Sequence, residues 1–256
     1  MNIHILGAHN GESQTTSCVC FLIDDTLAID AGGLTSNLSI SDQQKLAAIL
    51  LTHQHYDHIR DIPAIALNLS LRCHSIEVYS TADVLATIET HLLNGVVYPE
   101  FQKLPDSKPA VKLNVIKPYE PEKIDGHGIL AIPVNHGDTT VGYQVSDNQG
   151  KTVFYTADTG PGFAQCWAHI NPQLLIADVT LPNDYEEFAK QTGHLTPNLL
   201  KQELIIFRQL KGYLPQVIAV HMDAGLEEKI REEMALVAEA LNISITIAYE
   251  DMHLHI

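Results

Sequence analysis

The sequence lacks the features that would place it in or across a membrane. None of its apolar runs reaches the eighteen or so residues that a transmembrane helix needs, so we expect no membrane span. No basic segment followed by an apolar stretch opens the chain, and residues 2–6 already have the pattern of a strand, so we expect no secretion signal. The four cysteines (18, 20, 73 and 166) lack Cys-x-x-Cys spacing. We therefore expect reduced thiols, as in a cytoplasmic protein.

Positive charge is also scarce. Fifteen Lys and Arg face 31 Asp and Glu, which gives a formal net charge of −16. Because a nucleic-acid-binding surface is normally basic, this balance argues against a nucleic-acid partner. It does not exclude a small anionic substrate, since bound metal ions would make a pocket locally positive. With 45% apolar residues, the chain is expected to form one globular, cytoplasmic domain over residues 1–256.

The sequence contains one dense cluster of histidines. Within six residues stand three histidines and one carboxylate: His53, His55, Asp57 and His58. They directly follow the apolar run 46–51, which predicts a buried strand opening into a metal-binding loop. In an extended segment His53 and His55 point to the same side. Asp57 and His58 begin a predicted helix and point elsewhere, so one loop can serve two metal positions. The alternative is a histidine cluster on a solvated turn.

The pattern His-x-His-x-Asp-His after a strand resembles the signature of the metallo-β-lactamase-fold hydrolases. Polar residues recur at later strand ends and before one helix, in the order that the family has them: Asn135–Asp138, Thr156–Gly160, Thr192–Pro197 and Val220–Asp223. The resemblance therefore covers essentially the whole chain. It implies an α/β (α+β) fold, namely the four-layer αββα sandwich, whereas periodicity alone would not choose this architecture over another α/β fold.

Apolar periodicity places the elements of that fold along the chain. Strands are expected at 2–6, 18–24, 26–30, 46–51, 75–80, 129–134, 140–145, 152–156, 174–178, 216–220 and 244–249. Helices are expected at 41–45, 59–69, 82–93, 197–209 and 226–240. Residues 94–123 contain five prolines and lack clear periodicity. They are either a rim insertion near the site or a connecting loop with a strand at 111–116.

The resemblance further implies two divalent metal ions and seven ligands. These are His53, His55 and His136 on one ion, Asp57, His58 and His221 on the other, and Asp158 bridging both. Asp30, at the end of a strand, would lie behind the metal histidines, unless it is only a turn residue. Five imidazoles and two carboxylates without thiolate suit Zn²⁺ first, and also Mn²⁺ or iron.

The charges of such a centre suggest its chemistry. Two divalent ions bring four positive charges, of which Asp57, Asp158 and a bridging hydroxide remove three. The excess of about one positive charge would attract a phosphodiester monoanion and lower the pKa of the bridging water toward roughly 7. We therefore expect the bridging hydroxide to attack the substrate, and we count Asp57 among the catalytic residues.

One further motif separates the hydrolases that share this fold. Gly193–Pro197 resembles the extra histidine motif of the phosphodiesterase branch, found in class II cyclic-nucleotide phosphodiesterases and more loosely in tRNase Z. The neighbouring segments Asp158–Pro161 and Leu181–Asn183 are more similar to the former. His194 would stabilise the transition state or protonate the leaving alkoxide. Its alternative is a structural role beside the helix N-cap Thr196.

These observations leave several functions open. The leading hypothesis is a dinuclear metal phosphodiesterase for a small phosphodiester, most of all a 3′,5′-cyclic nucleotide, with a homodimer as an added expectation. The second is a tRNase Z-like ribonuclease, although no long basic arm is evident. The third is a non-hydrolytic di-iron sensor or metal-stabilised binding protein, and a hydrolase of carbonyl substrates also remains. His9, in the polar loop after the first strand, is a candidate for the pocket rim.

Overall fold

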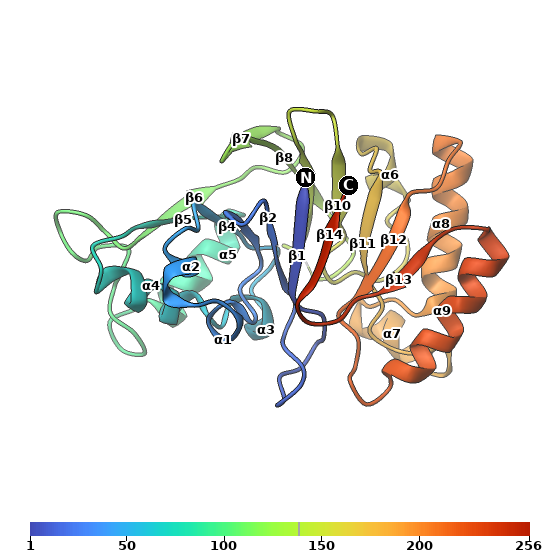
Figure 1. Cartoon of the computed structure of the whole chain (residues 1–256), viewed down its shortest axis with the longest axis horizontal. Helices are drawn as coiled ribbons and strands as arrows, with labels where there is room; N and C mark the ends of the chain where they lie inside the picture. The colour runs from blue at the N-terminus through green and yellow to red at the C-terminus, as the bar shows by residue number, and fades with distance from the viewer. Residues whose placement is uncertain (138) are drawn as a thin grey trace.

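The computed structural model describes residues 1–137 and 139–256, and Asp138 of the predicted Asn135–Asp138 stretch lies outside these residues. Two seven-stranded sheets lie face to face, and helices cover both outer faces (Figure 1). This arrangement is a four-layer αββα sandwich, which confirms the fold class expected from the sequence.

The first sheet contains the N-terminal strands and the last strand of the chain. Its order is β14-β1-β2-β3-β4-β5-β6, and β3 to β6 run parallel to one another. Its strands are β1 (Asn2–Gly7), β2 (Cys20–Ile23), β3 (Leu27–Ile29), β4 (Ala48–Leu50), β5 (Ile76–Ser80), β6 (Val111–Val115) and β14 (Met252–His255). The helices of this half are α1 (Leu34–Asn37), α2 (Ile40–Gln43), α3 (Tyr56–Ile59), α4 (Ile62–Ser70), α5 (Ala82–Thr87) and a π-helical turn (Ile88–Leu92).

The second sheet has the order β13-β12-β11-β10-β9-β8-β7, with β10 to β13 parallel. Its strands are β7 (Glu122–Ile124), β8 (His127–Pro133), β9 (Val141–Ser146), β10 (Thr152–Tyr155), β11 (Leu174–Asp178), β12 (Gln216–Val220) and β13 (Ile245–Ile247). The helices of this half are α6 (Ala164–His169), a 3₁₀ turn (Asn183–Tyr185), α7 (Glu186–Thr192), α8 (Pro197–Lys211) and α9 (Glu227–Leu241).

The main core fills the space between the sheets and continues under α8 and α9. Phe21 of β2 and Tyr155 of β10 are fully buried and meet edge to face, with ring centroids 5.1 Å apart. A second apolar cluster joins the outer face of the first sheet to α4 and α5, for example through Ile65 and Val78. Inner strands such as β2, β3, β4 and β11 are buried on both faces, which explains why they appear in the sequence as continuous apolar runs.

Several boundaries differ from the sequence-based expectation. The helix expected at 59–69 is two helices, because α3 ends near Arg60 and α4 begins after Asp61 with Pro63 in its first turn. Proline lacks a backbone N–H and favours the start of a helix over its interior. The strand expected at 244–249 is only β13. The short helices α1, α6 and α7 were not predicted, because their lengths give too few turns for an apolar period.

Residues 94–123 are a connection whose last part enters the fold. Val111–Val115 forms the edge strand β6 of the first sheet, one residue shorter than expected, and Glu122–Ile124 forms the edge strand β7 of the second. Phe101 and Ala110, which precede β6, are buried in the apolar cluster under α5. The segment thus carries the chain from one sheet to the other.

Two further observations concern the described part of the chain. None of its helices is both long and apolar enough to cross a membrane. Its four cysteines are free: Cys73 is exposed, and Cys18, Cys20 and Cys166 are buried.

Candidate metal centre

The carboxyl ends of parallel strands in both sheets open toward the same site. In the first sheet β3 is followed by Asp30, and β4 by His53. In the second sheet Asp158 follows β10 and His221 follows β12, while Asp178 ends β11. Ligand sites in α/β folds lie at such carboxyl edges, because the loops that follow the strands converge there.

The histidine loop is held against the turn after β3. His55 is the N-cap of α3, and Asp57 and His58 lie in its first turn. A Cβ atom added to Gly32 would lie 2.1 Å from the backbone oxygen of Asp57, so only glycine permits this approach. The backbone N–H of Ala31 also donates to the carbonyl of His58 at 2.7 Å. The segment Asp30–Gly33 therefore fixes the start of α3.

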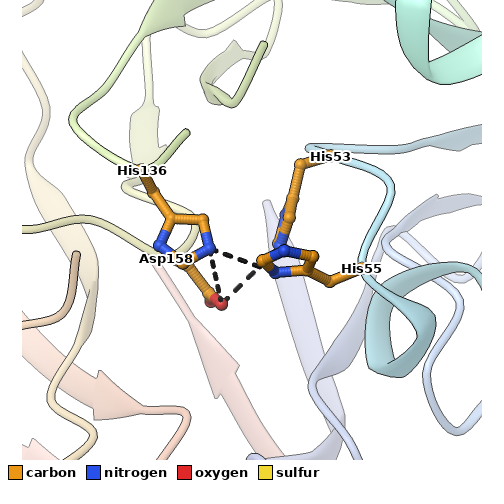
Figure 2. Close-up of side chains that lie close together, drawn as sticks. All are labelled: His53, His55, His136 and Asp158. Atoms are coloured by element: carbon orange, nitrogen blue, oxygen red, sulfur yellow. Dashed lines mark hydrogen bonds and ion pairs between the residues drawn. The ribbon is translucent and has the colours of Figure 1, made fainter. Parts of the chain in front are cut away.

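The first cluster joins His53, His55, His136 and Asp158 (Figure 2). Its potential ligand atoms all lie within 4.8 Å of one another. Nε2 of His136 is 3.1 Å from Nδ1 of His55, and Nε2 of His53 is 3.7 Å from Oδ2 of Asp158. These four residues come from both sheets, so the cluster spans the sandwich.

The second cluster joins Asp57, His58, His221 and again Asp158. Oδ1 of Asp158 lies 3.3 Å from Nε2 of His58 and 3.4 Å from Nε2 of His221. Asp158 thus directs Oδ2 toward the first cluster and Oδ1 toward the second. The structure brings together all seven residues that the sequence resemblance assigned as ligands, in the same two groups.

Buried polar atoms without partners show that the clusters fit divalent cations. Within the described residues, Nε2 of His53, Nε2 of His58 and Oδ1 of Asp158 are buried and accept no hydrogen bond. Leaving such groups unsatisfied in a protein interior costs free energy, so each needs a partner. A divalent ion that prefers nitrogen and oxygen ligands would supply that partner in each cluster.

The outer nitrogens of the histidines are held by hydrogen bonds that orient the rings. Nδ1 of His58 lies 2.8 Å from Oδ2 of Asp30, and Nδ1 of His136 lies 2.8 Å from the carbonyl of Gly193. Nδ1 of His221 lies 2.8 Å from Oγ1 of Thr180. Such contacts fix the tautomer and turn Nε2 toward a metal.

Asp30 is fully buried behind the histidine loop, as the resemblance implied. Besides contacting His58, its carboxylate accepts hydrogen bonds from the backbone N–H of Thr52 at 2.9 Å and from Oγ1 of Thr52 at 3.0 Å. Asp30 therefore holds the two ends of the histidine loop, Thr52 before its first histidine and His58 at its end.

The electrostatics of His53, His55 and Asp57 favour metal-binding protonation states. Burial, together with the nearby His58 charge, holds the pKa of His53 well below its usual value, and burial also lowers the pKa of His55. Burial alone would raise the pKa of Asp57, but hydrogen bonds with His221 and His58 hold it well below its ordinary range. Neutral imidazole and ionised carboxylate are the forms that bind metal. His58 differs, because burial lowers its pKa but the carboxylates of Asp158 and Asp30 raise it well above its usual value, so this ring must lose its proton when a metal binds.

His194 lies beside both clusters. It follows Gly193, which ends α7 in the left-handed conformation (φ 74°), and it precedes Thr196, the N-cap of α8. The His194 ring stacks on His221 with centroids 5.4 Å apart, and the His136 ring centroid is 4.9 Å away. In the described chain only Nδ1 of His194 has hydrogen-bond partners, and Nε2 has none.

Asp178 holds His194, and sequence reasoning missed it. Oδ2 of Asp178 lies 3.0 Å from Nδ1 of His194, and Oδ1 accepts a hydrogen bond from Oγ1 of Thr180 at 2.6 Å. Although burial lowers the pKa of His194, the carboxylate of Asp178 raises it to about 9. The available signal was a carboxylate ending an apolar strand, the same pattern that pointed to Asp30 and Asp158.

His9, which the sequence offered as one candidate for the pocket rim, is buried away from it. It is 2% exposed, and its ring lies between two carboxylates. Nδ1 is 2.6 Å from Glu250 and Nε2 is 3.2 Å from Glu227. The polar loop after β1 folds inward here because two carboxylates compensate the burial of its imidazole.

Comparison with known proteins identifies the family. The model of the beta-lactamase superfamily domain matches residues 25–222, more than half of the chain. The chain belongs to the beta-lactamase superfamily. This superfamily member is 21% identical over 255 aligned positions to a 3′,5′-cyclic-nucleotide phosphodiesterase of Aliivibrio fischeri, covering 81% of this chain and 75% of the relative.

Solved structures show the same fold over the whole length of this superfamily member. The metallo-beta-lactamase fold protein YhfI from Bacillus subtilis is 21% identical, with a TM-score of 0.77 and coverage of 99% of this chain and 98% of YhfI. Unliganded yeast PDE1 is 17% identical, with a TM-score of 0.80 and coverage of 100% and 99%. The chain therefore has the metallo-β-lactamase fold.

Proposed function

We propose that this chain is a dinuclear metal-dependent phosphodiesterase that hydrolyses small phosphodiesters, with 3′,5′-cyclic nucleotides as the favoured substrates and Zn²⁺ as the favoured metal. The observation that carries the proposal is the position of His194, stacked on His221 and held by Asp178 beside two candidate metal clusters. The similarity to a curated cyclic-nucleotide phosphodiesterase over most of the chain supports the same substrate class.

The proposed metal ligands are the seven clustered residues. His53, His55, His136 and Asp158 would hold one ion, and Asp57, His58, Asp158 and His221 the other. When bound, two such ions supply positive charge for an anionic phosphoryl group and make water acidic enough to ionise near neutral pH. Asp57 is 30% exposed on its side chain, so this ligand also borders the space that a substrate would enter.

His194 would provide the proton that a phosphodiester needs. An alkoxide leaves poorly unless it is protonated, and an imidazolium within hydrogen-bond reach can donate that proton. With Nδ1 bound to Asp178, the ring keeps its orientation and presents Nε2. Thioester cleavage has less need of such a donor, because a thiolate leaves readily. The Asp178–His194 pair thus favours phosphodiesters over carbonyl substrates.

A cavity beside the histidine loop could take the organic part of the substrate. Its volume is ≈ 300 Å³, and its walls include Val115, Ile116 and Val141. Oγ1 of Thr139, also in its wall, donates to the side chain of Gln54 at 2.8 Å, which connects the cavity to the metal loop. An apolar wall suits the nucleoside part of a nucleotide.

The test is turnover of two substrates by the metal-reconstituted protein. We expect hydrolysis of 3′,5′-cyclic AMP and of an aryl phosphodiester. His194→Ala should lower kcat for cyclic AMP by about 10²–10⁴-fold and reduce aryl diester cleavage far less, since an aryloxide leaves without a proton. The exposed His91→Ala is the matched control and should retain both activities.

Other outcomes point to the alternative functions. Cleavage of the aryl diester alone would eliminate cyclic AMP as substrate and keep the metal chemistry. Activity on neither substrate, with both metals bound, would contradict the proposal and favour a di-metal sensor or a carbonyl hydrolase. Cleavage of tRNA precursors with strongly salt-dependent binding would favour the ribonuclease.

A further inference from the structure

A second group of side chains of the types that bind metal ions lies outside the centre described above. His4 is on β1, His253 is on β14, and Asp251 is in the turn that precedes β14. His4 and His253 are directly opposite in the antiparallel pair, and their rings stack with centroids 3.8 Å apart and planes 19° apart. The strand register, rather than a flexible loop, therefore sets the distance between the two imidazoles.

The carboxylate of Asp251 lies close to both imidazoles. Oδ1 of Asp251 is 2.8 Å from Nε2 of His4 and 3.5 Å from Nε2 of His253. Two ligand atoms on a tetrahedral zinc ion, each about 2.1 Å from the metal, lie about 3.4 Å apart. All potential ligand atoms of the group lie within 4.8 Å of one another. Because a metal ion lies in the plane of each imidazole that it binds, the stacked rings of His4 and His253 would have to turn out of their parallel arrangement to direct both Nε2 atoms at one ion. The exposed side chain of His253 has room for this rotation.

We propose that His4, Asp251 and His253 form a separate, surface-accessible site for a divalent ion of the Zn²⁺ class. Two imidazoles and one carboxylate are donors that such ions prefer, and three protein ligands leave a position for water. The side chains of Asp251 and His253 are 84% and 66% exposed, so an ion can enter without opening the fold. The site shares no residue with the central clusters and does not depend on the proposed function.

A metal at this site would bind the last strand to the first. β14 is an edge strand whose partner in the sheet is β1. Glu250, next to Asp251, accepts a hydrogen bond from the backbone N–H of Ser17 at 3.0 Å and contacts His9. An ion on Asp251 would therefore stabilise both the edge strand and the turn that supports the loop after β1. We infer a structural role for this ion.

The test counts Zn²⁺ ions per chain by equilibrium dialysis and elemental analysis, with free Zn²⁺ raised after the central clusters are filled. Wild type should bind one more ion than His253→Gln, whose affinity for that ion should fall at least tenfold. Asp251→Asn should lose the same ion. His255→Gln is the matched control, because His255 lies on the same strand two residues away and bonds Asn2 instead.

A second measurement separates specific binding from chance association. Added Zn²⁺ should raise the Tm of wild type and of His255→Gln by more than that of His253→Gln. Equal stoichiometry and equal Tm gain in wild type, His253→Gln and Asp251→Asn would overturn the proposal. Loss of the ion in the variants without any effect on the central clusters would support it, whether or not the protein hydrolyses a phosphodiester.

Discussion

Three carboxylates at strand ends make different contacts in this protein. Asp158 faces both metal clusters, Asp30 lies behind the histidine loop, and Asp178 holds His194. All three are buried. Histidine or hydroxyl donors satisfy Asp30 and Asp178, whereas Oδ1 of Asp158 has no hydrogen-bond partner among the described residues. The role of an aspartate at the end of a strand therefore depends on which histidines its carboxylate contacts.

At the residue scale, Asp30→Asn should weaken metal binding. The amide keeps the shape of the carboxylate, but it no longer provides an anionic acceptor for Nδ1 of His58. Loss of such an outer contact typically lowers metal affinity about 10–100-fold. Competition with a coloured chelator measures this change, and Asp25→Asn, on an exposed turn, is the control. Equal metal affinity in both variants would show that Asp30 has only a structural role.

Four of the candidate ligands, His53, His55, Asp57 and His58, form one dense motif after an apolar run, which indicates metal binding by itself. His136, Asp158 and His221 are single residues at later strand ends, and only the resemblance to the family assigned them as ligands. The position of Asp178 at the end of an apolar strand was visible in the sequence, but its contact with His194 was not, because His194 lies sixteen residues further on, in a loop whose path depends on α7. His9 was misplaced for the same reason: its two glutamates come from distant segments of the chain.

At the scale of elements, the loop after β1 and the turn before β14 are joined by an ionisable pair. Burial lowers the pKa of His9, but hydrogen bonds with Glu250 and Glu227 raise it above 6.5 overall. Glu250 shows the opposite change: burial raises its pKa, and the contact with His9 outweighs this and lowers it. The pair thus favours protonated histidine and ionised glutamate.

The pH dependence of stability follows from these directions. The His9 contribution is fully present below about pH 6.5 and is lost as the pH rises through its raised folded-state pKa. The Glu250 contribution is present above about pH 4.5 and is lost as the pH falls through its lowered folded-state pKa. Urea unfolding should therefore show the largest destabilisation by Glu250→Gln near pH 5.5 and a smaller one at pH 8.5 or above. Glu228→Gln, on the exposed face of α9, should show no such trend. A destabilisation that grows with pH would contradict the assignment.

Sequence periodicity located most elements but not their interruptions. The break between α3 and α4 arises where the carboxylate of Asp61 accepts a hydrogen bond from the backbone N–H of Thr35, at 2.7 Å. This contact involves a segment 26 residues earlier in the chain, so an apolar period cannot reveal it. The edge strand β7 was not expected either, whereas β6 lies within the strand that was one alternative for residues 111–116.

At the scale of the whole molecule, the proposed metal centre links the two sheets. His53, His55, Asp57 and His58 follow a strand of the first sheet, whereas His136, Asp158 and His221 follow strands of the second. A ligand that binds only the folded state at 1,000 times its Kd adds about 4 kcal/mol to the free energy of unfolding. For a domain of about this size, that corresponds to a Tm change of roughly 8–16 °C.

Removal of metal should therefore lower Tm by roughly 8–16 °C. Differential scanning calorimetry before and after exhaustive chelation measures it, and restored Zn²⁺ should reverse it. Asp30→Asn should show a smaller difference, since its metal affinity is reduced. An unchanged Tm after complete metal removal would show that the sheets dock without help from the centre.

The placement of the candidate ligands also sets an order of events during synthesis. His58 leaves the ribosome about 160 residues before His221, which at about 5–20 residues per second is an interval of roughly 8–30 seconds. Throughout that time the histidine loop exists without the strand that completes it, and β1 exists without β14. The nascent chain therefore carries an open imidazole cluster for several seconds, and mature metal affinity arises only when the last third of the chain has been made.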